Sequence, residues 1–323
     1  MSAEAATKGG QLAGLAVDLE AAWGGARDVV LRPIPESHSG FTYWVSATVD
    51  GVSAEAVLRL PPPGARPVGP ADVVRQTRIM RALGASKVPV PEILASSPEP
   101  VLGGRPFVLM SKVPGVGLAD LGDQMTAHQI MRASFDTLEL IADVPAGETG
   151  LDGEAVTDPL EDVRRWAALR ERAPAELVAR APELEARLLR ARPATGRPRL
   201  VHGDYHPGNL VFRDGSVVAV LDWEIAGLGV VPSDKAGLCL LAIRKRFGEA
   251  YSGEPAAIPL EDTLAMAGEP DFDHVLAATC HKYAAILGYN LGLHRRGKRI
   301  DPVYEGLTRT IPGLIDVGLE LVA

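Results

Sequence analysis

The sequence predicts an α+β protein built from two lobes. Strand signals are concentrated in the first 115 residues, and helical patterns dominate the rest of the chain. A strand-rich segment followed by a helix-rich one is typical of α+β proteins. The helical part is interrupted once, at residues 199–223, where a loop, a short hairpin and a strand follow one another. We therefore expect a small antiparallel-sheet lobe over residues 1–112 and a larger helical lobe over residues 113–323.

The first lobe contains a clear hairpin signal. Residues 41–49 and 55–60 are rich in aromatic and β-branched side chains, and Asp50-Gly51 lies between them. Two such runs around Asp-Gly predict two antiparallel strands joined by a tight turn. The proline-rich stretch of residues 61–64 then ends the second strand.

Helical spacing and a further strand complete the expected first lobe. Residues 1–30 show loose helical spacing, and residues 70–84 predict a second helix. One face of that second helix carries Val73, Gln76, Met80 and Leu83. A short strand is expected after residues 89–91, and residues 106–110 predict another strand that leads into the second lobe.

Composition excludes several classes of protein. The net charge is 33 − 41 = −8, which argues against a nucleic-acid partner because phosphate backbones require a basic face. No stretch reaches the ~18 apolar residues of a membrane span, and the first residues lack the pattern of a signal peptide. Residues 277–293 predict a buried helix, and Cys239 and Cys280 predict buried free thiols. We therefore expect a cytoplasmic protein without a membrane partner.

One motif carries a recognisable chemistry. Residues 201–209 read VHGDYHPGN, and Asp222 follows thirteen residues after Asn209, at the end of an apolar strand. Asn209 and Asp222 supply the oxygen ligands that Mg²⁺ prefers, while Asp204 stays available to accept a proton from an attacking hydroxyl. The alternative interpretation is that His202, Asp204 and Asn209 only stabilise a turn.

Five segments together resemble one known family. They are HGDYHPGN, VLDWE, VLRLPPPG, PVPEIL and LHRRGKRIDP. The chain resembles the aminoglycoside phosphotransferase and choline kinase family, which shares the protein-kinase fold, from about residue 30 to residue 320. Within that family it is most similar to the bacterial group related to the kinase-like domains attached to acyl-CoA dehydrogenases.

The resemblance implies a role for each motif residue. Asp204 corresponds to the catalytic base, His202 to a brace of the catalytic loop, and Asn209 and Asp222 to the magnesium ligands. Asp234 corresponds to an aspartate that steadies the same loop; a helix N-cap is the alternative interpretation, and the two roles can coexist. The implied cofactors are Mg²⁺ and ATP, with GTP as the other possible donor.

The nucleotide lobe departs from the family pattern at two positions. Arg59 lies where the family usually carries a phosphate-binding lysine, and a guanidinium is not equivalent to an ammonium. The helix glutamate that normally holds this residue is replaced by Gln76. Gln76 can donate and accept hydrogen bonds but supplies no charge, and charge-assisted bonds are about twice as strong as neutral ones.

Two further segments of this lobe match nucleotide contacts of the family. Residues 37–43 resemble its phosphate loop, with Ser39 and Gly40 as the candidate contacts, and Gly40 is the only glycine there. Few glycines leave few backbone N–H groups free to approach a phosphate. The backbone of Ser111 and Val113 corresponds to the hinge that binds adenine.

The acceptor is predicted only as a class, a small molecule with a hydroxyl group. Residues 115–162 contain eleven acidic residues and residues 249–273 contain seven, which favours a cationic acceptor. Acidic helix faces are also commonly just solvated. The basic run of residues 295–299 argues against a cationic acceptor, because it would suit an anionic molecule such as a coenzyme A ester. The alternative is that these residues only complement the dipole at a helix C-terminus.

Two functional hypotheses follow. The first is a small-molecule kinase, an ATP- and Mg²⁺-dependent phosphotransferase acting on an alcohol group. The second is a degraded kinase that binds a nucleotide or metabolite without turnover, which Gln76 and the glycine-poor loop favour. Retention of Asp204, Asn209 and Asp222 together favours the enzyme. The sequence argues against a protein kinase, because it contains no activation-loop pattern in which Asp-Phe-Gly is followed by Ala-Pro-Glu.

Overall fold

The structure is a computed structural model that describes residues 3–34, 41–66, 68–248 and 258–323. The chain divides into two compact units, and each is described by itself. Unit 1 comprises residues 1–115, 147–152 and 218–225, and unit 2 comprises residues 116–146, 153–217 and 226–323. The two short later segments of unit 1 are held by hydrogen bonds to backbone carbonyls. The Arg78 guanidinium donates to the Gly150 carbonyl, and Val220 N donates to Pro89 O over 2.8 Å.

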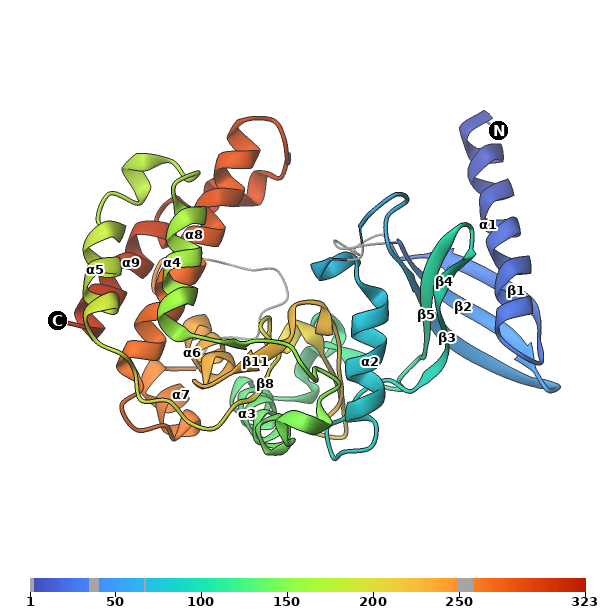
Figure 1. The fold of residues 1–323 in the computed structure, drawn as a ribbon, viewed down its shortest axis with the longest axis horizontal. Helices are drawn as coiled ribbons and strands as arrows, with labels where there is room; N and C mark the ends of the chain where they lie inside the picture. Colours follow the sequence, from blue (N-terminus) through green and yellow to red (C-terminus); the bar gives the residue numbers. More distant parts are fainter. Residues whose placement is uncertain (1–2, 35–40, 67, 249–257) are drawn as a thin grey trace. The chain divides into compact units, whose positions relative to one another are not determined.

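Unit 1 is built on a five-stranded antiparallel sheet with the strand order β1-β2-β3-β5-β4 (Figure 1). The strands are β1 (Ala26–Pro33), β2 (Phe41–Val49), β3 (Val52–Leu60), β4 (Ile93–Leu102) and β5 (Arg105–Ser111). The predicted hairpin is confirmed, because β2 and β3 pair directly and both turn residues have positive φ, 49° at Asp50 and 83° at Gly51. Two positive φ values give the turn a twist that suits a two-residue hairpin.

Two helices cover opposite faces of this sheet, α1 (Ala3–Ala22) on one side and α2 (Val73–Leu83) on the other (Figure 1). Leu58 and Leu60 are fully buried in the apolar core that also contains Leu19 of α1. Because successive strand residues point to opposite faces, Arg59 lies on the face that carries α2. The alternation therefore places the positive charge of Arg59 on the α2 face of the sheet.

Two sequence predictions for unit 1 need correction at their edges. The first helix ends at Ala22, and β1 follows within the segment expected to continue as a helix. The pairing of β1 with β2 shifts register between Arg27 and Val30, and Asp28 has a φ of 55°. This irregularity breaks the alternation that would reveal a strand. The predicted helix of residues 70–84 is confirmed, but it begins only at Val73, after the N-cap Asp72.

Unit 2 is mainly helical, as predicted (Figure 1). Its helices are α3 (Ala127–Asp143), α4 (Pro159–Arg170), α5 (Ala181–Arg190), α6 (Ser233–Lys245), α7 (Leu260–Ala267), α8 (Asp273–Arg295) and α9 (Thr310–Leu321). The long helix α8 packs against α4, α5, α6 and α9 and is the central element of the unit. The prediction of a buried helix over residues 277–293 is therefore confirmed.

Both cysteines are free and completely buried, as expected. Cys239 lies on α6 and Cys280 on α8, and burial raises the pKa of each thiol to about 12. Such thiols stay protonated and behave as small apolar side chains. In the part of the chain that the structure describes, no helix combines the length and the apolar character needed to cross a membrane.

Short strands hold the loops of unit 2 in place. A small sheet has the strand order β7-β11-β8, from β7 (Val156–Thr157), β11 (Gly227–Gly229) and β8 (Arg199–Val201), and β6 (Val116–Gly117) pairs with β9 (Leu210–Arg213). The motif loop runs from the end of β8 to the start of β9, so both of its ends are anchored. After the turn at Asp214-Gly215, β10 (Ser216–Val220) carries the chain into the last segment of unit 1.

Candidate active site

The loop after β8 is held by its backbone. Asp234, in the first turn of α6, accepts hydrogen bonds from His202 N over 2.7 Å and from Gly203 N over 2.9 Å. One carboxylate therefore fixes two consecutive peptide groups, and charge-assisted bonds of this kind are strong. The role implied for Asp234 by resemblance matches this geometry. The N-cap interpretation is wrong, because Pro232 occupies the N-cap position of α6.

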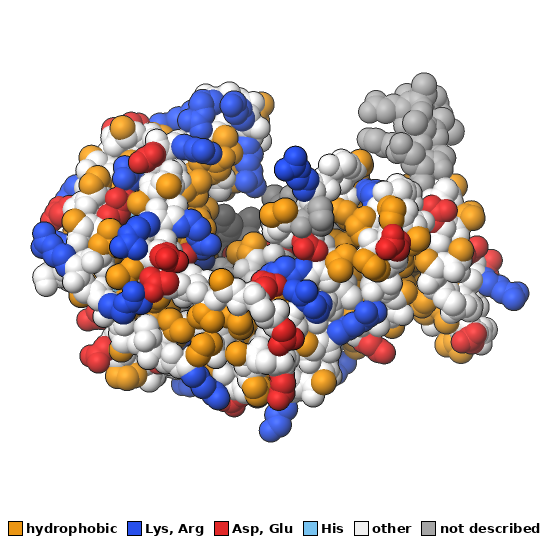
Figure 2. All heavy atoms as spheres, in the orientation of Figure 1, with side chains coloured by type: hydrophobic (Ala, Val, Ile, Leu, Met, Phe, Trp, Pro, Cys, Tyr) orange, Lys and Arg blue, Asp and Glu red, His pale blue; other side chains and the backbone are white. Residues whose placement is uncertain are grey.

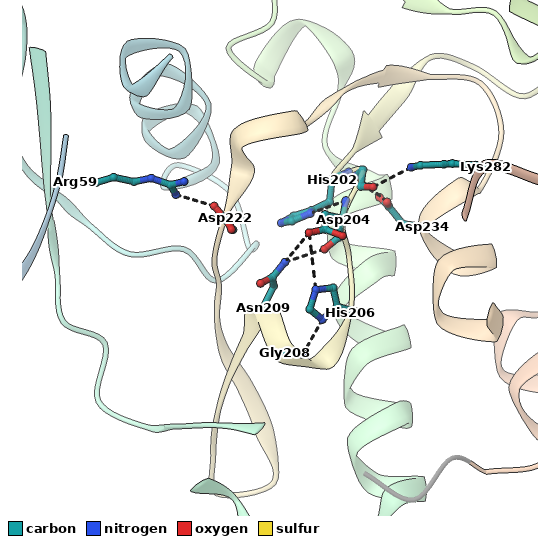
Figure 3. Close-up of polar contacts among 10 residues, drawn as sticks. Arg59, His202, Asp204, His206, Gly208, Asn209, Asp222, Asp234 and Lys282 are labelled. Carbon is teal, nitrogen blue, oxygen red and sulfur yellow. Dashed lines mark hydrogen bonds and ion pairs between the residues drawn. The ribbon is translucent and has the colours of Figure 1, made fainter. Parts of the chain in front are cut away.

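A lysine also holds the same loop through its backbone. Lys282 on α8 donates from Nζ to the Gly203 carbonyl over 3.1 Å (Figure 3). Its ammonium lies 5.4 Å from the ring centre of Trp166 and 5.6 Å from that of Tyr283. Burial lowers the pKa of Lys282, while the negative charges of Asp162, Asp234 and Asp204 act in the opposite direction. Gly203 has a φ of 86°, a backbone conformation that suits glycine.

Asp204 lies at the turn of this loop, and its carboxylate stays accessible. Its side chain is 45% exposed. Asn209 donates from Nδ2 to the Asp204 carbonyl over 2.9 Å and makes a long contact of 3.5 Å to the carboxylate (Figure 3). His202 is fully buried, and its Nδ1 accepts the Asp204 N–H over 3.3 Å. Unit 2 thus brings the three predicted residues of the motif together, with the carboxylate of Asp204 turned outward from a fixed backbone.

His206 is a residue of this loop that the sequence analysis did not single out. Its Nδ1 accepts the Gly208 N–H over 3.1 Å, and its Nε2 lies 3.8 Å from Asp204 Oδ2. Because Nδ1 is an acceptor, the neutral ring carries its proton on Nε2, the atom that faces Asp204. A Cβ at position 208 would come within 2.8 Å of the His206 ring, which explains the glycine. The sequence did contain a signal for this residue, because His206 lies inside the motif of residues 201–209.

Unit 1 contains a separate cluster of charges around Arg59. This residue is only 8% exposed, and its Nη1 donates to Asp222 Oδ1 over 2.6 Å (Figure 3). Its Nη2 donates to Glu224 Oε2. Asp222 lies two residues after the end of β10 and has a φ of 65°, which is uncommon for a residue other than glycine and is more frequent at functional sites. Glu224 was not among the predicted site residues.

The remaining predicted nucleotide contacts have mixed outcomes. Gln76 is buried on α2, as its place on the apolar face predicted, and its proposed contact with Arg59 stays a prediction. Ser39 and Gly40 lie outside the described residues. Ser111 N already donates to Glu92 O over 2.8 Å. An adenine contact by Ser111 therefore has to use its carbonyl group, and the contact by Val113 stays a prediction.

A cavity of about 510 Å³ lies in unit 2 beside Asp204. One face of α6 and one face of α8 form two of its walls, since the lining residues of each helix follow helical spacing. They are Gly237, Leu240, Leu241 and Arg244 on α6, and Tyr283, Ile286, Leu287 and Asn290 on α8. The motif loop closes one end with Asp204, His206, Pro207 and Gly208, and Gly117, Leu118, Ala119 and Tyr304 complete the described lining.

The described lining of this cavity is largely apolar. Asp204 is its only carboxylate among the residues that the structure describes, and Arg244 contributes a buried guanidinium from the α6 wall. Figure 2 shows acidic and basic side chains intermixed on the visible face, without a single acidic surface. The described part of the cavity therefore adds no support to the prediction of a cationic acceptor.

The residues proposed as metal ligands suit magnesium in chemistry. Asp222 offers a carboxylate whose side chain is 33% exposed, and Asn209 uses its Nδ2 within the loop. Among the described residues, Asn209 Oδ1 makes no hydrogen bond and remains available as a ligand. The described residues contain no group of three or more His, Cys, Asp or Glu side chains that could hold a metal by themselves. Magnesium commonly uses one or two protein ligands together with phosphates and water.

The structure has the protein-kinase-like α+β fold, with an antiparallel-sheet unit and a helical unit. The chain belongs to the family described as the phosphotransferase enzyme family, which it matches over residues 30–269. The predicted fold and the predicted family are both confirmed.

Solved structures of this fold cover almost the whole chain. A candidate aminoglycoside phosphotransferase from Ralstonia eutropha is 21% identical, with a TM-score of 0.75 over 95% of this chain and 97% of that one. The complex of APH(2″)-IIIa with GDP and kanamycin is 16% identical, with a TM-score of 0.63 over 95% and 96% of the two chains. At these identities the likeness concerns the fold alone.

Curated relatives extend well beyond this chain. Acyl-CoA dehydrogenase family member 10 of Mus musculus is 31% identical over 194 residues, which is 58% of this chain and 18% of that protein. The chain spans about a quarter or less of the first three relatives it matches, 18%, 25% and 24% of their lengths.

Proposed function

We propose that the protein transfers the γ-phosphoryl group of ATP or GTP to a hydroxyl of a small molecule, with Mg²⁺ as cofactor. The observation that carries this proposal is the placement of Asp204. Its carboxylate stands half-exposed at one end of a cavity of ligand size, on a loop whose backbone is held by Asp234 and Lys282. A carboxylate placed in this way can accept the proton of a hydroxyl that attacks a phosphoryl group.

The residues around Asp204 divide the work of the reaction. Asp204 orients the acceptor hydroxyl and takes its proton, and Asn209 holds the Asp204 backbone through its side-chain amide. His202 fills the space behind the loop and accepts the Asp204 N–H. Catalysis by positioning of this kind contributes much of the rate in phosphoryl transfer, because little covalent chemistry is left to the protein.

Nucleotide binding is assigned to the residues of unit 1, with Arg59 as the phosphate-binding side chain. We propose Asn209 and Asp222 as ligands of a nucleotide-bound magnesium ion, supported by the Asn209 Oδ1 atom, by the partly exposed carboxylate of Asp222 and by the family membership. Bound magnesium supplies positive charge that neutralises the phosphates. The neighbouring structure with GDP makes GTP a donor to be tested beside ATP.

The acceptor-binding site is assigned to the cavity between α6 and α8. Its aliphatic side chains favour an acceptor with an apolar portion, since burying apolar surface contributes about 25 cal/mol per Å². The neighbour solved with kanamycin makes aminoglycosides one class to test. A cationic acceptor remains an expectation from the sequence, and the described lining favours a less charged molecule.

A thermal-shift and turnover screen tests this function. The purified protein is mixed with Mg-ATP or Mg-GTP and with aminoglycosides, macrolides, choline, sugars and hydroxyacyl-CoA esters. A kinase shifts its unfolding temperature with the nucleotide and releases nucleoside diphosphate only with its acceptor. Clear binding of Mg-ATP or Mg-GTP, with neither hydrolysis nor transfer to any acceptor, would instead favour the degraded kinase.

A further inference from the structure

We propose that Glu224 is the positioning residue that holds Arg59 toward the nucleotide phosphates, in place of the carboxylate that position 76 lacks. The inference rests on the proposed function and names a role that neither the family match nor the relatives assign. Its basis is the ion pair from Arg59 Nη2 to Glu224 Oε2 in unit 1. Glu224 acts through Arg59 and is not a catalytic residue.

The burial of this pair makes a carboxylate necessary. The side chains of Arg59 and Glu224 are only 10% and 16% exposed. A guanidinium withdrawn from water requires a counter-charge, because a buried unpaired charge is strongly destabilising. A neutral amide at position 76 cannot meet that requirement. The structure meets it with a carboxylate from a different part of the sequence.

Among the described residues, Asp222 and Glu224 are carboxylate partners of Arg59, and the proposed function separates their roles. Asp222 pairs with Arg59 Nη1 over 2.6 Å, but the same carboxylate is proposed to ligate magnesium when nucleotide is bound. A carboxylate shared with a divalent cation attracts a guanidinium less strongly. Glu224 is then the partner that keeps Arg59 oriented in the nucleotide-bound state. Two separate carboxylates therefore allow metal binding and arginine positioning at the same time.

Glu224 is itself rigidly placed, next to the helix that carries Gln76. It lies in the short 3-10 helix η7 (Trp223–Ile225), which packs against α2. Trp223 is only 1% exposed, and its Nε1 donates to the Val220 carbonyl over 3.0 Å. A carboxylate introduced at position 76 would therefore lie on the helix that packs against the segment of Glu224. This proximity makes a rescue experiment possible.

The decisive experiment measures Mg-ATP and Mg-GTP affinity by isothermal titration in matched variants. Glu224→Gln removes the charge, and Glu99→Gln makes the same change at an exposed position of β4 in unit 1. We expect about tenfold weaker binding for Glu224→Gln, as for the loss of a charge-assisted contact, and no change for Glu99→Gln. In the Glu224→Gln background, the second change Gln76→Glu should restore most of the lost affinity.

A second measurement needs no nucleotide. Thermal unfolding of the apo-protein in a double-mutant cycle of Arg59→Met and Glu224→Gln should show strongly non-additive changes in Tm, because each single change removes the same ion pair. The same unfolding measurement also reports whether each variant is folded.

Unchanged or tighter nucleotide binding in folded Glu224→Gln would overturn the inference, since Glu224 would then merely mask the charge of Arg59. Additive Tm changes, or a folded double variant in which Gln76→Glu restores nothing, would also overturn it. Wild-type protein that binds neither nucleotide would overturn the proposed function and the inference with it. Wild-type binding that Glu224→Gln leaves intact would overturn the inference alone.

Discussion

The two groups of candidate site residues are stabilised in different ways. In unit 2, the bonds that hold the catalytic loop go to backbone groups of Gly203 and its neighbours, so the carboxylate of Asp204 stays available. In unit 1, the functional side chains bind one another, since Arg59 is paired with Asp222 and Glu224. The motif loop is therefore already held by its own bonds, whereas the proposed phosphate binding by Arg59 requires the guanidinium to exchange at least one protein partner.

The largest effect is expected at Asp204. Asp204→Asn keeps the shape of the side chain and removes its ability to accept a proton. We expect kcat to fall by about 10²–10⁴-fold, which is the usual contribution of a general base. Affinity for Mg-ATP should stay nearly unchanged, because the proposed role concerns the acceptor. Single-turnover assays with the acceptor found in the screen, together with nucleotide titration, measure both. Equal turnover in the two proteins would reduce Asp204 to a structural residue of the loop.

A second large effect is expected at Asp222, the residue that links the charge cluster to the metal. Asp222→Asn should weaken Mg-ATP binding by about tenfold or more and remove most of its dependence on Mg²⁺ concentration. Titrations at several Mg²⁺ concentrations provide the measurement. A variant with the same Mg²⁺ dependence as wild type would exclude Asp222 as a metal ligand and leave it as a partner of Arg59.

An intermediate effect is expected at Lys282. Lys282→Met leaves the Gly203 carbonyl without its donor, and such a loss costs about 1–3 kcal/mol. We expect kcat to fall by about tenfold, with little change in nucleotide affinity, and Lys282→Arg to restore part of the rate. Lys245→Met, at an exposed position of α6, is the matched control. A rise in KM for the nucleotide at unchanged kcat would argue against a role in holding the catalytic loop.

The smallest effect on the reaction is expected at Glu185, which anchors α8 next to Lys282. Burial raises the pKa of Glu185, but hydrogen bonds from His281 and Arg170 outweigh it and lower the pKa below its ordinary value of 4.5. A carboxyl group with a lowered pKa stabilises the fold above that ordinary value, and this stability is lost as pH falls through the folded pKa.

Glu185→Gln should therefore reduce the free energy of unfolding by about 1–3 kcal/mol at pH 7, and the difference from wild type should shrink below about pH 4.5. Denaturant unfolding at several pH values measures it. Glu183→Gln, an exposed position on the same helix, should cost less than about 1 kcal/mol. A Glu185 effect that does not change with pH would show that packing, and not the ionised carboxylate, provides the stability.

The sequence alone determined the class of fold and pointed to the candidate catalytic motif. Strand-rich and helix-rich segments follow one another along the chain, and Asp204, Asn209 and Asp222 lie close together in the sequence. Local spacing is enough for such features, because turn chemistry and side-chain periodicity act over a few residues. Glu224 could also have been found, since it stands two residues after Asp222 in a motif that was already singled out.

Only the tertiary structure decided which charges meet. Lys282 lies far along the chain from Gly203, and Glu185 lies far from His281, so no local pattern could pair them. Arg59 pairs with carboxylates more than 160 residues away, at sequence separations of 163 and 165. The sequence suggested a partner on the helix of residues 70–84, because that is where the family carries one. Long-range ion pairs depend on the folded path of the chain and on burial, and neither can be read from residue spacing.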